Sequence, residues 1–553
     1  MDQALRRAVA RLLGAACGQV RKLPQPYWAY GLLVLIFFPV LWGAYALLAP
    51  VARLSVWWAL WQDAQSLQAL GVTLVSSVLS TLLACALAAL FASGFYPGAR
   101  WARFQRHLPL LLSVPHAAFA VGFFFLFAPS GWIARGLALW MQWPNPPDWA
   151  SVQDAYGLSL ALALAVKESW FLLWMMAALL GEQAIATQML MGRTLGYNKR
   201  QVWRLILWPQ LWPRLVWPVI AVFAYGLSVV DMAMILGPST PPSLAVLAWE
   251  WLRSADPALQ ARGQAASIAL VLILLCCVAG VSLLVYGFKR FRAYPSGRRQ
   301  PGPGRRGLPL DAMLGGLGYG VVLVLLLWSV AETWFFPAIW PSALTLSFWQ
   351  QANLAPFWTT LWLASASSLL CLPVVLIVLE WAPARLRRLL YLPLILPVLP
   401  LAAGQYGSLV KMNLDGSVLG LIWSHLPWVF PYMLLTLTGP YQAFDARLLF
   451  SARALGCSPW QACWRVKWPV LLRPILIAWS VGFAVSVAQY LPTIFAGAGR
   501  FATVTTEAVA LSAGGSRAVL AVQSLLQVAL PLAAFGAAML LAHWHGRGRK
   551  GLQ

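Results

Sequence analysis

Ionisable side chains stand inside stretches of the sequence that are otherwise apolar. Asp231 lies in one such stretch, and Lys167 and Glu168 are neighbours in another. A charge at bilayer depth costs at least ~2.5 kcal/mol on insertion scales, so it persists only where it is paired or faces water. These residues could bind a polar solute as it crosses a membrane, or they could join helices through hydrogen bonds. The sequence leaves both roles open.

Lys167 and Glu168 are adjacent, so their side chains cannot point the same way from a helix. Each is therefore expected to have its own partner. Asp231 is one candidate partner for Lys167. The sequence does not decide between this pairing and others.

A serine followed by a polar residue three positions later occurs twice. Segment 227–231 aligns with segment 485–489, which matches Ser228 with Ser486 and Asp231 with Gln489. We expect each pair to share a helix face, and the two faces to meet across a pseudo-two-fold axis. The remaining candidates for a path through the membrane are Tyr490, His116, Gln405 and Tyr406. The last three could instead serve packing or helix kinks, because Pro115 and Pro400 lie nearby.

No arrangement of side chains indicates covalent chemistry. The sequence contains neither a recognisable Ser-His-Asp pattern nor a metal-binding one. Cys457 and Cys463 have no cysteine or histidine partner at the spacing of a zinc site. We therefore predict no catalytic residue, no metal and no cofactor held by this chain.

The composition places these residues in a membrane. Of the 553 residues, 61% are hydrophobic and only 10% are charged, and 32 are tryptophans. Many apolar runs approach the ~20 residues that a helix needs to cross a bilayer. We predict an all-α polytopic membrane protein with about twelve spans, at 29–49, 69–93, 108–128, 157–180, 215–237, 265–288, 310–332, 355–379, 389–410, 417–438, 473–494 and 518–542.

A basic segment rich in proline and glycine divides the spans into two sets of six. Residues 289–308 have the composition of a solvated linker. The sequence thus predicts a first half over residues 1–288 and a second half over residues 309–553.

Positive charge is concentrated in alternate loops. Thirty-one of the 39 Lys and Arg residues fall on one side of the predicted spans. The positive-inside rule therefore places both termini and the linker in the cytoplasm. Because the net charge of +24 is spread over seven segments rather than gathered on one face, it does not indicate nucleic-acid binding.

One motif occurs in both halves, in the cytoplasmic loops between the fourth and fifth spans. In each copy a glutamine lies five positions after a glycine, and a proline lies 13 positions after the same glycine. Each loop, at about 181–214 and 439–472, reads as a helix, a glycine turn and a second helix that re-enters the membrane. The shared residues are Arg193, Leu195, Gly196, Trp208 and Pro209 in the first copy, and Arg453, Leu455, Gly456, Trp468 and Pro469 in the second.

These loops resemble the coupling loop of permease subunits from type I ABC importers. That loop has Glu-Ala-Ala, three residues, Gly, nine residues, Ile, one residue and Leu-Pro. The glycine, the proline and the Ile-like position, Ile206 or Val466, match in both halves. The chain departs from the pattern at Glu-Ala-Ala, replaced by segments 190–192 and 450–452, and at the leucine before proline, which is Trp208 or Trp468. The departures put in doubt the acidic contact that this loop offers the ATPase.

The resemblance covers nearly the whole chain and implies two MetI-like permease halves fused in one polypeptide. Ferric-iron and thiamine permeases are among such fused proteins. Segments 486–492, 497–500 and 505–508 are most similar to the YnjC-like branch.

Transport by such a protein needs an energy source. A phosphate-cradling loop needs Gly-Lys, and this dipeptide is absent from the sequence, so the ATPase must be another chain. The resemblance implies two copies of a cytoplasmic ABC ATPase subunit, which bind ATP and Mg²⁺, and a periplasmic substrate-binding protein. It further implies import by alternating access across the bacterial inner membrane. No particular substrate follows, whether thiamine-like, ferric iron or another.

Two other classes of protein remain open. An ion-coupled carrier with six plus six helices would share the helix count and the pseudo-symmetry, but would not need matched loops. An integral membrane enzyme is disfavoured by the scarcity of clustered acids and histidines.

Overall fold

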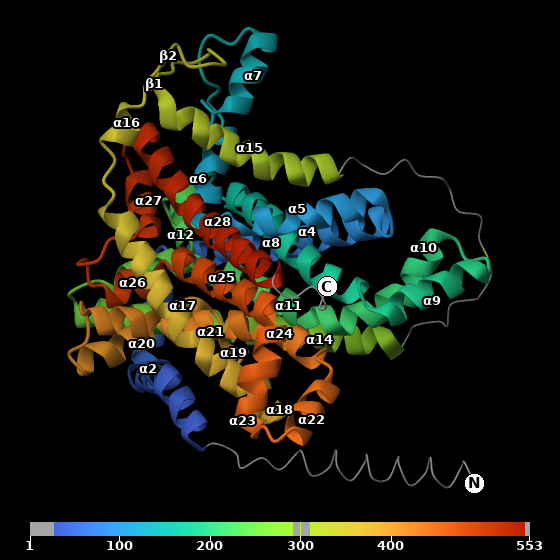
Figure 1. Cartoon of the computed structure of the whole chain (residues 1–553). Coiled ribbons are helices and arrows are strands. Elements are labelled where there is room, and N and C mark those ends of the chain that lie inside the picture. Colours follow the sequence, from blue (N-terminus) through green and yellow to red (C-terminus); the bar gives the residue numbers. More distant parts are fainter. Residues whose placement is uncertain (1–26, 291–298, 300–309, 548–553) are drawn as a thin grey trace, which may run out of the picture.

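The computed structural model describes residues 27–290, 299 and 310–547. Most of the predicted linker, the first basic cluster from Arg6 to Lys22 and the last three residues of the predicted C-terminal basic cluster lie outside this range. Nearly all regular secondary structure in the described part is helical, which confirms the predicted all-α fold class. Figure 1 shows the helices gathered in one bundle.

The first half contributes thirteen α-helices and one π-helix to the described part of the chain. They are α2 (Tyr27–Val51), α3 (Leu54–Gln62), α4 (Ser66–Phe95), α5 (Ala99–Ser113), α6 (His116–Phe127), α7 (Trp132–Met141), α8 (Leu158–Leu180), α9 (Gln183–Thr194), α10 (Lys199–Gln201), the π-helix Val202–Leu207, α11 (Trp208–Ser228), α12 (Asp231–Leu236), α13 (Leu244–Leu252) and α14 (Pro257–Arg290).

The second half repeats the order of long and short helices and adds a small hairpin. Its elements are α15 (Leu310–Val330), β1 (Ala331–Thr333), β2 (Ala343–Leu344), α16 (Ser347–Gln350), α17 (Ala355–Trp381), α18 (Ala384–Leu389), α19 (Leu392–Ile395), α20 (Val398–Lys411), α21 (Val418–Gln442), α22 (Ala446–Ala454), α23 (Pro459–Ala462), the π-helix Cys463–Lys467, α24 (Trp468–Val470), α25 (Leu472–Ala488), α26 (Leu491–Ala496), α27 (Val504–Ser512) and α28 (Arg517–Arg547). Strands β1 and β2 pair antiparallel, with Ala331 opposite Leu344.

Within the described residues, ten helices are long and apolar enough to cross a membrane. The number reaches twelve if two bent helix pairs each count as one span. The count agrees with the twelve predicted spans, but four of them are broken. Spans 108–128 and 389–410 break before Pro115 and Pro397, where the preceding residue is disfavoured from helical geometry. Spans 215–237 and 473–494 break at residues 229–230 and 489–490.

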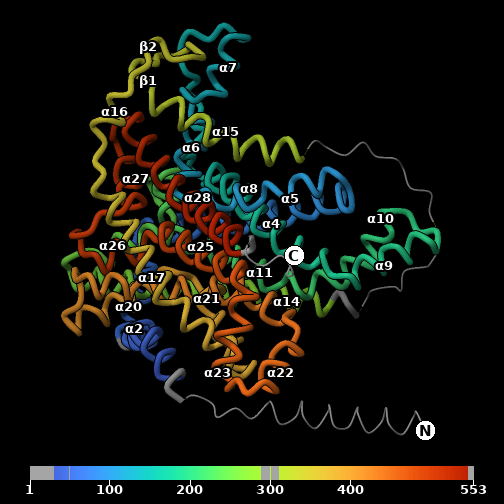
Figure 2. Tube along the Cα trace, viewed as in Figure 1, coloured from blue at the N-terminus to red at the C-terminus, as the bar shows by residue number. Residues whose placement is uncertain are grey.

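The first long helix of each predicted half packs on the other half. Helix α2 lies along α20, as the trace in Figure 2 shows, and α15 lies along α6 and α28. The α2 and α20 backbones touch at Gly43 and Gly404, where a Cβ on Gly404 would lie 2.7 Å from the carbonyl carbon of Gly43. Small residues permit such close helix contacts in membranes. The two predicted halves are thus interlocked by these helices.

The Gly43–Gly404 contact gives a direct test of the packing. We expect Gly404→Ala to lower the stability of the protein by about 1–3 kcal/mol, because the added methyl group meets backbone rather than a movable side chain. Gly407→Ala is the matched control, since Gly407 lies one turn further along α20 and has open space beside it. Melting temperatures of both variants in detergent would check this, and equal values would contradict it.

Candidate functional site

Two helix breaks lie at equivalent places in the two halves. Helix α12 begins at Asp231, 35 positions after Gly196, and α26 begins at Leu491, 35 positions after Gly456. The structural counterpart of Asp231 is therefore Leu491. The predicted match of Asp231 with Gln489 is wrong by two residues, because the alignment followed the serines and could not see the breaks.

Lys167 and Glu168 point in different directions, as predicted from their adjacency. The Glu168 carboxylate contacts Nε2 of His116 at 3.1 Å. The Lys167 ammonium donates to the carbonyls of Leu111, at 3.2 Å, and Val114, at the C-terminal end of α5. The proposed pairing of Lys167 with Asp231 is absent, because the exposed carbonyls of α5 take up the ammonium group.

Asp231 lies at the first position of α12 and is only 7% exposed. Its own backbone N–H and that of Met232 bond its carboxylate, as acidic groups at helix N-termini commonly do. His116, Tyr225 and Tyr490 are its electrostatic neighbours. The structure thus brings together four residues of the predicted path: His116, Glu168, Asp231 and Tyr490.

Two tyrosines join this cluster that the sequence did not single out. The ring of Tyr225 lies 4.7 Å from that of His116, between centroids. Tyr225 and Tyr432 interact electrostatically with each other and with Glu168. In the sequence, a tyrosine in an apolar stretch cannot be told from an interfacial or packing residue. Its neighbours are seen only in the structure.

The other predicted path residues mainly join helices. The Ser228 hydroxyl accepts from the N–H of Val398, the first residue of α20, at 2.9 Å. Gln405 donates to the carbonyl of Trp423 at 3.4 Å, and the backbone N–H of Gln489 donates to the carbonyl of Ser486 at 3.3 Å. Tyr406 stacks on Phe495, with ring centroids 5.5 Å apart.

His425 is a further buried residue that sequence reasoning missed. Its Nδ1 lies 2.8 Å from the Ser486 hydroxyl and its Nε2 lies 3.0 Å from the Thr493 hydroxyl. The ring therefore links α21 to α25 and α26 across the second helix break. No spacing signal could have found this contact, since the partners are 61 and 68 positions away.

The motifs of both loops form the predicted helix, glycine turn and helix. Gly196 and Gly456 have φ values of 84° and 88°, in the left-handed region that favours glycine. In the first loop the N–H groups of Gly196 and Tyr197 donate back to Arg193 and Gly192. The same two bonds recur from Gly456 and Cys457, so each turn is a Schellman helix end.

The spacing that the two loops share after each glycine has a structural cause. Gln201 and Gln461 are the third residues of short helices and complete capping boxes with Asn198 and Ser458. A π-helix follows in each loop and ends before the Trp-Pro pair. A π-helix has a wider turn than an α-helix. This turn suits the proline that follows it, because proline cannot donate a backbone hydrogen bond.

The position of the last alanine of Glu-Ala-Ala holds a small residue in both loops, Gly192 and Ala452, for a packing reason. A Cβ on Gly192 would lie 2.5 Å from the Ile206 side chain. Its counterpart 260 positions later, Ala452, is 7% exposed. The two early acids of the loops are engaged within the chain: Glu182 accepts from Arg214 at 2.7 Å, and Asp445 caps α22.

A buried ion pair holds the second loop against α17. The Lys467 ammonium lies 2.6 Å from the Glu380 carboxylate, and both side chains are about nine-tenths buried. The hydroxyl of Tyr441 donates to Glu380 at 2.9 Å and accepts from Nε1 of Trp468 at 2.9 Å. In the first loop the positions of Lys467 and Tyr441 hold Leu207 and Gly181, so the same network cannot form.

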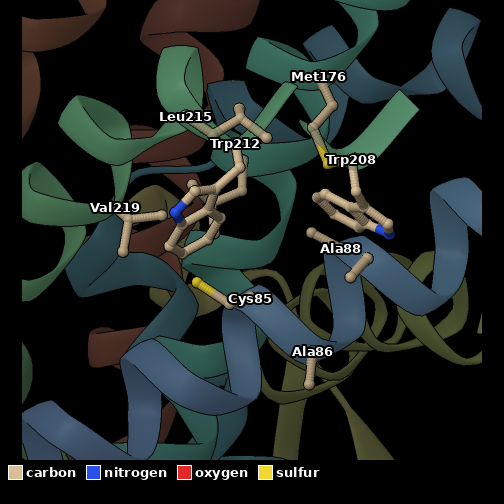
Figure 3. Close-up of a pocket in the computed structure, with 10 residues that line it drawn as sticks. Cys85, Ala86, Ala88, Met176, Trp208, Trp212, Leu215 and Val219 are labelled. Atoms are coloured by element: carbon tan, nitrogen blue, oxygen red, sulfur yellow. The ribbon is translucent and has the colours of Figure 1, made fainter. Parts of the chain in front are cut away.

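The first loop instead borders an apolar groove between α4, α8 and α11. Figure 3 shows Trp212 beside Cys85 and Trp208 beside Ala88 of α4. The groove has a volume of about 340 Å³, and nearly all of its lining is apolar. Trp208 and Trp468 thus occupy the same motif position in unlike surroundings.

The overall sequence has a well-matched relative. The chain is 39% identical over 533 residues to the inner membrane ABC transporter permease protein YnjC of Escherichia coli strain K12, covering 95% of this chain and 98% of that protein. This chain belongs to the YnjC-like ABC transporter permeases. No family model matches it. The YnjC-like assignment made from three short segments is confirmed, and the helix count is that of a polytopic permease.

Breaking the Lys467–Glu380 pair of the second loop should destabilise this YnjC-like permease more than breaking an exposed ion pair of the first loop. We expect Lys467→Ala to destabilise it by about 3–5 kcal/mol, because the variant leaves the Glu380 carboxylate buried without its partner. Arg214→Ala is the control, since it breaks an ion pair whose side chains are 51% and 43% exposed. The control should cost at most about 1 kcal/mol.

Thermal unfolding in detergent, followed by tryptophan fluorescence, measures both variants. The double variant Lys467→Met with Glu380→Leu should recover much of the lost stability, because it removes both charges together. A single variant as stable as the Arg214→Ala control would disprove the buried pair.

Proposed function

We propose that this chain is the transmembrane permease subunit of an ATP-driven importer in the bacterial inner membrane. It takes a small solute from a periplasmic binding protein and releases it into the cytoplasm. The similarity to the YnjC permease supports the ABC class and the inner-membrane location. The matched loop turns are the observation that carries the proposal.

The two loops present apolar side chains to solvent at their tips. Leu195 and Leu455 precede the turn glycines and are 59% and 86% exposed. Their neighbours Leu190, Met191, Leu448 and Phe450 are also exposed. Exposed apolar patches on folded domains commonly mark contact sites for partners. Arg193 and Arg453, in the last turns of α9 and α22, add positive charge beside them.

Two such patches suit two copies of one ATPase subunit. Both loops have the same turn and the same capping box, so identical surfaces of a partner can dock on each. ATP and Mg²⁺ bind to those partners. The loops lie at the right and lower right of the bundle in Figure 1, well away from α7 and the β1–β2 hairpin.

Transport then follows from movement of the loops. Closure of the ATPase pair on ATP draws both loops together, and the interlocked halves rock so that the central path opens outward. Release of ADP and phosphate resets the path inward. Helix α11 continues from the first loop to the helix break before Asp231, and α25 runs from a 79° bend after α24 to the break before Leu491. A loop displacement therefore reaches the path through one helix in each half.

The positive-inside distribution supports the direction of insertion, with both loops and both termini in the cytoplasm. The periplasmic binding protein then docks on the opposite face. An ion-coupled carrier and a membrane enzyme remain as alternatives, and neither class requires paired, apolar-tipped turns.

A charge placed on the loop tips tests the ATPase contact. The variant Leu195→Asp with Leu455→Asp should lose a co-purifying ATPase-sized partner, because a carboxylate replaces the apolar tip without altering the glycine turn. The matched control is Leu344→Asp, which changes a similarly exposed leucine, 66% exposed, on the β1–β2 hairpin. The control should keep the partner.

Pull-down from native membranes, followed by ATPase assays, measures attachment. Replacement of Gly196 and Gly456 by valine should have the same effect, because valine disfavours the left-handed turn. Full transport by the isolated chain without nucleotide would refute the proposal and favour an ion-coupled carrier.

A further inference from the structure

The polar cluster of the membrane interior is built from both halves. His116, Glu168, Tyr225 and Asp231 come from α6, α8, α11 and α12, whereas Tyr432 and Tyr490 come from the second half. These residues interact through the His116–Glu168 bond and through the electrostatic contacts described above. The cluster therefore spans the interface along which the two halves rock.

Acidic side chains outnumber basic ones in this cluster. It contains the carboxyl groups of Glu168 and Asp231 and one imidazole, that of His116, which hydrogen-bonds Glu168 and is an electrostatic neighbour of Asp231. Lys167 is turned away and bonds the end of α5. Within the described part of the chain, the carboxylate of Asp231 has no side-chain hydrogen bond or ion pair, although the residue is 93% buried. A buried carboxyl group that no side chain hydrogen-bonds directly is suited to receive a positive charge.

The aromatic residues supply a second, independent attraction for a cation. Tyr225 interacts electrostatically with both carboxyl groups, Tyr432 with Glu168 and Tyr490 with Asp231, and the faces of aromatic rings carry negative potential. The hydroxyls of Tyr225 and Tyr432 make no hydrogen bond to any described residue, so they are available to a solute. The Tyr490 hydroxyl contacts the Met234 sulfur at 3.6 Å. An anion here would meet carboxylates and ring faces.

We propose that this cluster is the solute site of the path and that it selects an organic cation, an ammonium or a similarly charged ring nitrogen. Asp231 provides the charge contact, and Tyr225, Tyr432 and Tyr490 hold the apolar surface around the charge. The inference rests on the proposed transport function and adds the class of substrate to it.

Binding of model cations to the full-length chain in nanodiscs tests the site without its partners. The probes are tetramethylammonium, choline and benzyltrimethylammonium, each compared with a neutral isostere in which carbon replaces nitrogen, such as 3,3-dimethylbutan-1-ol for choline. At least one cation should raise the melting temperature in a saturable way, and its isostere should not. Equal effects of cation and isostere, or no effect of any of the three cations, overturn the proposal.

Variants assign the effect to the cluster. Asp231→Asn should weaken binding of the active cation about tenfold or more, the scale of one charge-assisted contact. Tyr225→Leu should weaken it as well, whereas Tyr225→Phe should retain the ring contribution. Asp311→Asn is the control, because Asp311 is a carboxylate at the start of α15, 3.9 Å from Arg100. Unchanged cation binding in Asp231→Asn would also overturn the proposal.

The outcomes separate this inference from the proposed function. Cation binding by a chain that fails to retain an ATPase would leave the site standing and remove the importer. Retention of the ATPase by a chain that binds none of the cations would remove only the site.

Discussion

The structure depends on how the backbone N–H and carbonyl groups at helix breaks find hydrogen-bond partners inside an apolar medium. Hydrocarbon offers no water to an exposed N–H or carbonyl, so each helix break must find its partners in protein. Side chains of other helices supply them here. The hydroxyls of Thr73 and Thr360 accept from the N–H groups of Leu244 and Val504, the first residues of α13 and α27. Ser228 does the same for α20, and the Lys167 ammonium serves the end of α5. These contacts fix where α13, α20 and α27 begin and where α5 ends.

The spans and the loop turns could be predicted from the sequence, whereas the helix breaks could not. Apolar length predicted the spans well, because the bilayer imposes that length directly. The glycine turns were predictable as well, since Gly196 and Gly456 need a conformation that few other residues adopt. The breaks at residues 229–230 and 489–490 were not predicted, because valine and alanine around them look like any span interior. The alignment of Asp231 with Gln489 failed for that reason.

Partnerships between distant side chains were also outside the reach of sequence. Lys167 and Asp231 have opposite charges in neighbouring spans, yet Lys167 bonds carbonyl groups, which no pattern of side-chain types records. Glu380 gave no signal at the end of its span, although it anchors Lys467 and Tyr441. Tyr225 and Tyr432 resembled ordinary aromatic residues of a membrane protein. The sequence alone therefore predicted the charged members of the polar cluster and missed two of its tyrosines.

The two halves share a plan but differ in how firmly each loop is held. The second loop is joined to α17 through a buried network of Lys467, Glu380, Tyr441 and Trp468. The first loop has leucine and glycine at the positions of Lys467 and Tyr441, and its tryptophan borders the groove of Figure 3. Fusion of two permease halves in one polypeptide permits this divergence, because each loop can change without altering its counterpart.

An apolar contact resists sliding less than a buried ion pair does, since dispersion forces are not directional whereas charged hydrogen bonds are. Under the proposed coupling, equal displacements of the two loops would then move α25 together with α17 as one unit, while α11 would shift against α4. The path would consequently be reshaped mainly on the side that carries Tyr225 and Asp231.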